Sequence, residues 1–268
     1  MEHAALAVAL AASLAAPSLD GVFERLRDRT DPQGQVEAAA ELSRRAGGLD
    51  LGDQHRAVTA LAQAASDSFS AGQVRGKALD ALGRSAGAMS DEQSRREAVR
   101  TLLEHAAADG PQDFRTETKV YALRGLAQAA ARLPSDDETR AGVLGAALDA
   151  MRGQSRPAER TQGAMLLDSA LRGGALGAML RSYPLKGRFE YEVVSPLEGG
   201  GLSALYSDAQ GTLEYRYFLM RSLALMGRVI GSEPNLPHRC RAILSAMAQS
   251  DPDPRLREMA RLYSYPSR

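Results

Sequence analysis

Tryptophan is absent from this 268-residue chain, aromatic residues make up only 5% of it, and cysteine occurs once. A lone cysteine excludes an intrachain disulfide and a cysteine-based zinc site. Cys240 stands near Ile243 and Leu244 on a predicted apolar helix face, so we expect a buried structural thiol. Short side chains, mainly alanine, favour closely packed helices over a β-sandwich.

The chain also lacks net charge. Its 33 basic residues balance 33 acidic ones, so no overall field attracts nucleic acid or anionic lipid. Only Lys77, Lys119 and Lys186 are lysine, and this bias toward arginine indicates a GC-rich, bacterial genome. With 44% hydrophobic residues, the chain can form one sizeable core or one elongated repeat domain.

The most apolar stretch, residues 4–16, is too short to cross a bilayer, so we expect no transmembrane span. It has the length of the apolar part of a secretory signal, yet no lysine or arginine precedes it. We predict that residues 1–17 form a first helix or end cap, with a signal remnant as the alternative. The first case implies a cytoplasmic protein and the second a periplasmic or secreted one. Residues 18–268 are predicted to form a single domain.

The outline of one amphipathic helix, residues 74–87, recurs along the chain. Similar patterns occupy residues 120–132, 217–228 and 251–262. Leucines at matching positions are mostly spaced by about 40 residues, and they are Leu42, Leu82, Leu126, Leu167, Leu223 and Leu262. Two helices in each such period are typical of helical repeat proteins.

The sequence DPDPRLREMA at residues 251–260 resembles the HEAT-repeat turn and second helix, in which Asp-Pro precedes an aliphatic-Arg-x-x-Ala run. Residues 74–83 resemble the same motif, and residues 31–40 are a weaker copy. The resemblance covers roughly residues 31–264, apart from residues 185–211. It implies an all-α fold, a right-handed α-solenoid of about five to six HEAT-like helix pairs, whose second helices line a concave surface. A fold of this kind says little about function.

Residues 185–211 interrupt the repeat pattern. Residues 188–194 alternate and are rich in strand-forming types, and three glycines follow at 199–201, so we expect an inserted loop or β-hairpin near 185–211. A strand edge there would offer pairing to a partner's strand.

Five of the eight tyrosines fall between residues 183 and 217. Tyrosine and arginine favour protein interfaces, and insertions in repeat arrays often lie on the binding face. We predict that a protein partner of unknown identity contacts Tyr183, Arg188, Tyr191 and Tyr206. The alternative is that these side chains pack within the fold and the insertion only covers the groove.

No catalytic, cofactor-binding or metal-binding residues are predicted. The four histidines are scattered, and no H-E-x-x-H motif occurs. The acidic run at residues 136–138 is expected to stabilise a helix start rather than to bind a metal. We predict a non-catalytic protein-binding scaffold or adaptor that acts through its concave face and the 185–211 insertion.

Two alternatives come from other functional classes. The first is a nucleic-acid-binding or base-repair HEAT-like module, which would need a basic groove and aromatic residues at the lesion. The neutral charge and the missing tryptophan do not favour it. The second alternative is a divergent metal-dependent enzyme.

Overall fold

The computed structural model describes residues 18–107, 112–152, 155–207, 212–229 and 235–264. These ranges are almost entirely helical, and no strand occurs in them. The predicted all-α class is therefore confirmed. Residues 1–17, expected to form an end cap or a signal remnant, lie outside the described residues.

The first part of the chain forms helices joined by short turns. Their bounds are α2 Leu19–Arg27, α3 Pro32–Arg45, α4 Leu51–Ser66, α5 Gly72–Ala88, α6 Glu92–Ala107, α7 Gln112–Ala129, α8 Asp137–Met151 and α9 Pro157–Ala170. Short 3₁₀ turns extend α3 and α7, and they are η1 Ala46–Gly48 and η2 Ala130–Arg132.

Shorter and less regular helices follow α9. They are the π-helix η3 Leu171–Ala175, α10 Leu176–Arg181, α11 Tyr183–Phe189, the π-helix η4 Glu190–Val194, the 3₁₀ turn η5 Ser195–Leu197 and α12 Gly201–Ser207. Longer helices then resume with α13 Leu213–Gly227, α14 Asn235–Ser250 and α15 Pro254–Ser264.

Side-chain caps explain where several helices begin. Asp136 accepts a hydrogen bond from the Thr139 backbone N–H at 2.7 Å, so the acidic run opens α8 as predicted. At α4 the cap is Asp50, which accepts a hydrogen bond from the backbone N–H of Asp53 at 2.8 Å.

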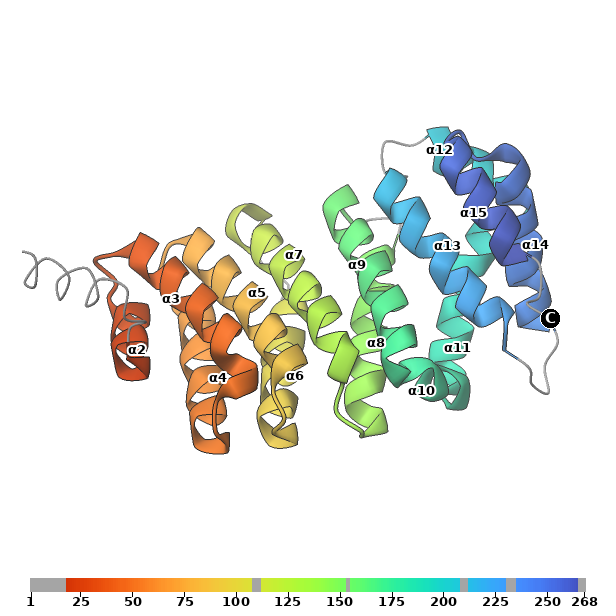
Figure 1. Cartoon of the computed structure of the whole chain (residues 1–268). Helices are drawn as coiled ribbons and strands as arrows, with labels where there is room; N and C mark the ends of the chain where they lie inside the picture. The colour runs from red at the N-terminus through yellow and green to blue at the C-terminus, as the bar shows by residue number, and fades with distance from the viewer. Residues whose placement is uncertain (1–17, 108–111, 153–154, 208–211, 230–234, 265–268) are drawn as a thin grey trace, which may run out of the picture.

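Helices that are alternate in the chain lie side by side. One row consists of α3, α5, α7, α9 and α13, each in contact with the next, and a second row consists of α2, α4, α6 and α8. The rows pack against each other through neighbouring pairs such as α4 with α5 and α8 with α9. Figure 1 shows the helices following one another in chain order from α2 at one end to α15 at the other.

The core between the rows contains most of the periodic leucines. Leu42, Leu82, Leu126, Leu167 and Leu223 are all fully buried. The last member of the series, Leu262, is 65% exposed, and Leu256 and Ala260 take the core positions of α15 instead. The match by spacing alone therefore selected the wrong face of the final helix.

The loop or β-hairpin expected at 185–211 is also wrong for residues 185–207, while residues 208–211 lie outside the described residues. Residues 188–194 form the end of α11 and all of η4, and α12 follows. Phe189, Val193 and Val194 are buried at helical spacing, so packing against the core overrides the strand preference of these residue types. No strand edge exists there to pair with a partner.

Candidate functional site

The four tyrosine and arginine positions predicted to bind a partner do not form one cluster. Tyr183 opens α11 and is 83% exposed, and Tyr191, in η4, is 78% exposed. Arg188 lies between them on the same continuous helix. Tyr206, in α12, is half-buried, and its hydroxyl lies 3.3 Å from that of Ser250 while the Arg216 guanidinium stacks on its ring. Tyr206 therefore ties α12 to the neighbouring helices.

Tyr191 is part of the wall of a groove that runs over α8, with a volume of about 1510 Å³. Gly142, Gly145 and Ala146 line the groove from α8. Because these side chains are so short, α8 is recessed between the helices on either side of it. We call this feature the α8 groove.

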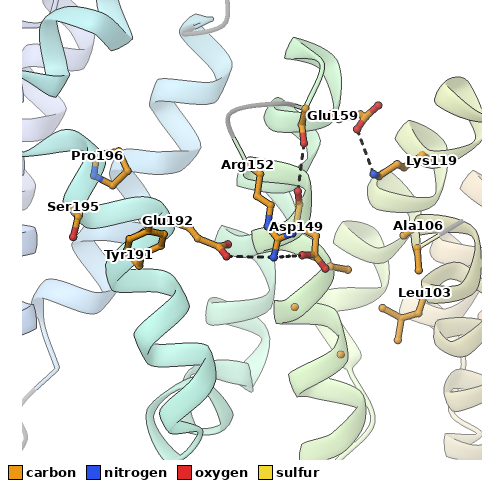
Figure 2. A pocket seen from close by; sticks show the side chains of 15 residues that line it. Leu103, Ala106, Lys119, Asp149, Arg152, Glu159, Tyr191, Glu192, Ser195 and Pro196 are labelled. Carbon is orange, nitrogen blue, oxygen red and sulfur yellow. Dashed lines mark hydrogen bonds and ion pairs between the residues drawn. The ribbon is translucent and has the colours of Figure 1, made fainter. Parts of the chain in front are cut away.

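The two walls of the α8 groove come from different parts of the chain. Leu103 and Ala106 of α6 form one wall, and Tyr191 of η4 with Pro196 of η5 forms the other. Figure 2 shows these walls on opposite sides of α8. The groove therefore presents apolar surface over a floor that a bound backbone can approach closely.

Charged side chains bridge α8 to η4. Arg188 donates to Asp149 at 2.9 Å and to both oxygens of Glu192 at 3.1 Å. Arg152 donates to Glu192 at 3.4 Å and pairs with Asp149 at 3.1 Å (Figure 2). Hydrogen bonding to Glu192 raises the pKa of Arg188 above its ordinary value. Arg188 thus holds η4 against α8, and the charges of the groove are mixed in sign.

A separate ion pair links α7 to α9. Lys119 of α7 and Glu159 of α9 approach to 3.4 Å, and both line the α8 groove (Figure 2). Their side chains are 25% and 11% exposed, which is well below the exposure of ordinary surface pairs in this chain. They link α7 to α9 beside the groove.

The wall that carries Tyr191 is a π-helix. Such segments have one extra residue in the turn and are found frequently at functional sites. In η4 the wider turn leaves Val193 and Val194 buried while Tyr191 and Glu192 line the groove. Because of this local geometry, neighbouring residues of η4 either pack into the core or line the groove.

Sequence reasoning missed most of the α8 groove. Gly142, Gly145 and Ala146, followed by Asp149, recur at spacings of three and four in a segment with a clear helical pattern. That recurrence places them on one face. Nothing in the sequence indicates that α6 and η4 flank this face.

Residues that could support other chemistry are dispersed or buried. Within the described ranges, no group of three or more His, Cys, Asp or Glu side chains could hold a metal ion. Cys240 is fully buried, which confirms the predicted structural thiol, and burial raises its pKa to about 12. None of the helices in the described part of the chain has the length and apolar character needed to cross a membrane.

Comparison with known proteins yields similarity of fold alone. No family model matches the chain, and no curated protein matches it. An engineered protein from the Northeast Structural Genomics Consortium is similar over 93% of this chain and 96% of its own, with a TM-score of 0.60 and 17% sequence identity. A second engineered protein from the same consortium matches over 92% of this chain and 62% of its own, with 15% identity and a TM-score of 0.47.

Proposed function

We propose that this chain is a non-catalytic scaffold or adaptor that binds a segment of a protein partner in the α8 groove. The observation that carries the proposal is a groove with a small-residue floor and an exposed tyrosine, Tyr191, on its wall. The sequence predicted binding through the concave face and through the segment 185–211. That segment supplies one wall of the α8 groove, which supports the proposal.

The size of the α8 groove favours a peptide over a small molecule. Pockets for small molecules enclose roughly 300–1,000 Å³, whereas this groove has about 1510 Å³. A floor of glycine and alanine lets a helix or an extended strand approach closely, as small residues do where helices pack tightly. Tyr191 adds a large, rigid side chain of the type that dominates binding energy at interfaces.

The charges of the α8 groove also favour a protein partner over a nucleic acid. Binding to phosphate backbones requires cations that are free to displace counterions. Here Arg152, Arg188 and Lys119 are each paired with a carboxylate. A protein segment of mixed charge suits such a lining better than a polyanion does.

We further propose that the helices form a right-handed α-solenoid of about five to six HEAT-like helix pairs. The contacts between alternate helices in each row support this architecture. The buried leucines at intervals of about 40 residues support it too. On this architecture the row from α3 to α13 would line the concave side, and the α8 groove would lie on the opposite side.

Site-specific photo-crosslinking tests the proposed function. A benzophenone amino acid would replace Tyr191 in one variant and Phe69 in another, since Phe69 is 83% exposed and lies outside the α8 groove. Each variant would be irradiated in lysate of the source cells, and the crosslinked products identified by mass spectrometry. We expect a discrete protein to be captured from position 191 and not from position 69.

A groove-filling variant makes this experiment specific. The one atom within 4 Å of an added Cβ at Gly145 belongs to the Arg188 side chain, at 3.9 Å. The backbone therefore has room for a side chain at this position, and we expect Gly145→Leu to fill the groove. We expect this change to abolish the crosslink from position 191 while leaving the thermal unfolding transition in place. Equal capture from both positions, or capture that survives Gly145→Leu, would contradict the proposed function.

A further inference from the structure

A second pocket lies between α9, α13 and α15, apart from the α8 groove. Its volume is about 490 Å³. We call it the α13 pocket, and its apolar lining consists of Met165, Leu213, Tyr217, Phe218, Leu256 and Met259. None of these residues lines the α8 groove.

The α13 pocket has the size and lining of a small-molecule site. Its volume falls inside the range of roughly 300–1,000 Å³ that is usual for such sites, which are mainly apolar with a few polar groups. Tyr217 and Phe218 meet edge to face, with ring centroids 5.1 Å apart. Met165 and Met259 add flexible, polarisable side chains that adapt to ligands of varied shape.

Gln162 lines the α13 pocket, and one of its side-chain atoms lacks a hydrogen-bond donor. The side-chain oxygen Oε1 of Gln162 is buried, and it has no hydrogen-bond partner among the described residues. A buried acceptor of this kind costs about 1–3 kcal/mol when it is left unsatisfied. Because Oε1 is closed to solvent, a ligand N–H or O–H group would remove that cost once the Gln162 side chain turned toward the pocket.

The charged groups around the α13 pocket disfavour an anion. Arg255 is held by Asp253, at 3.3 Å. Glu214 is exposed, and in the described part of the chain it has no ion-pair partner. Asp253, Arg255 and Glu214 together leave one net negative charge at the edge of the α13 pocket, which disfavours an anionic ligand.

We propose that the α13 pocket binds a small, mainly apolar molecule that carries an N–H donor and is neutral or cationic. The apolar body contacts the methionine and aromatic side chains, and the donor meets Gln162 Oε1. This inference goes beyond the proposed partner binding and does not depend on it, because the two sites share no residue.

Two fluorescent probes of the same skeleton test the inference. N-phenyl-1-naphthylamine is neutral and has one N–H donor, whereas 8-anilinonaphthalene-1-sulfonate adds an anionic group to that framework. We expect saturable binding of one neutral probe per chain, with an affinity at least about tenfold above that of the sulfonate. Equal affinity for the two probes, or no saturable binding of the neutral probe, would overturn the proposal.

Matched variants locate the binding of the neutral probe. Leu213→Asp introduces a charge into the α13 pocket, and it should weaken binding by about tenfold or more. Leu180→Asp is the control, because Leu180 lines neither site and its exposure of 37% is close to the 42% of Leu213. An equal loss of affinity in both variants, or none in Leu213→Asp, would overturn the assignment.

A third variant keeps the test independent of folding defects. Gln162→Leu removes only the proposed acceptor, and it should lower affinity for the neutral probe by roughly fivefold. Affinity equal to that of the wild-type chain would remove Gln162 from the proposal. Gly145→Leu in the α8 groove should leave probe binding unchanged, so failure of the two proposals can be distinguished.

Discussion

Gly83 of α5 and Gly125 of α7 face each other where the two helices touch backbone to backbone. A Cβ placed on Gly83 would overlap the α-carbon and carbonyl group of Gly125. Side chains in real structures do not come that close, so one helix would have to move. This contact explains why glycine is required at position 83 although glycine weakens helices.

Gly83→Ala should therefore destabilise the protein, by about 1–3 kcal/mol, because the added methyl group forces α5 and α7 apart. Urea unfolding followed by circular dichroism would measure the loss. Gly187→Ala is the matched control. A Cβ at Gly187, inside α11, meets nothing within 4 Å, so this change should stabilise the helix by roughly 0.5–1 kcal/mol. Equal effects of the two changes would contradict the packing argument.

Asp251→Ala should be strongly destabilising. Asp251 is fully buried and accepts hydrogen bonds from Arg216 of α13 at 3.1 and 3.3 Å. Removing the carboxylate takes away the two buried hydrogen bonds that Arg216 donates to it, which costs about 3 kcal/mol. Glu258→Ala is the control, because Glu258 and Arg261 are both exposed and their ion pair contributes about 0–1 kcal/mol. Chemical denaturation of both variants would measure the difference.

Asp168 should make the stability depend on pH in an unusual direction. Burial raises the pKa of Asp168 above its ordinary 3.8, although Arg221 and Arg172 act in the opposite direction. The folded chain therefore takes up this proton at a higher pH than the unfolded chain. The stabilisation from protonation is complete below pH 3.8 and is lost as pH rises through the folded-state pKa.

Asp168→Asn removes this proton uptake. The free energy of unfolding of the variant minus that of the wild type should therefore decrease as pH falls from neutral toward 3.8. Asp136→Asn should show the opposite slope, because hydrogen bonding to Thr139 lowers the pKa of Asp136. Urea titrations at several pH values would measure both slopes. Slopes of the same sign would refute the environment assigned to Asp168.

Cys240 should be unreactive in the folded protein. Burial raises its pKa to about 12, so almost no thiolate exists at pH 8, and the side chain is inaccessible. A thiol reagent such as dithionitrobenzoate should release no product from the native chain and one equivalent per chain in denaturant. Rapid reaction under native conditions would show that the helix face carrying Cys240 opens readily.

The pattern of apolar residues predicted the helices well in most of the chain. Leu42, Leu82, Leu126 and Leu223 were expected in the core at a regular spacing, and all four are fully buried. Cap residues are also local signals, and Asp136 opens α8 as expected. These features depend on interactions within a few residues of chain, so the sequence carries them directly.

Residues 188–194 show where local signals fail. Their alternation is typical of a strand, yet Phe189, Val193 and Val194 are buried in the helical core, and residues 190–194 form η4. Composition expresses a weak preference of about 1 kcal/mol or less per residue. Burial of several large side chains outweighs it.

The candidate site, too, could be predicted only in part from the sequence. The exposed aromatic side chains of Tyr183 and Tyr191 were identified from the sequence, and the structure shows both exposed. The α8 groove could not be identified in this way, because its walls come from α6 and η4, about 90 residues apart in the chain, a separation that periodicity does not bridge.

The sequence by itself determined the all-helical class, the core leucines and the buried thiol of Cys240, because periodicity and side-chain chemistry act within single helices. Only the tertiary structure decided that residues 188–194 are helical, that Tyr206 is a packing residue, and that α8 is the floor of a groove. Those outcomes depend on which helices become neighbours, and the free energy of that packing arises from contacts between segments far apart in the chain.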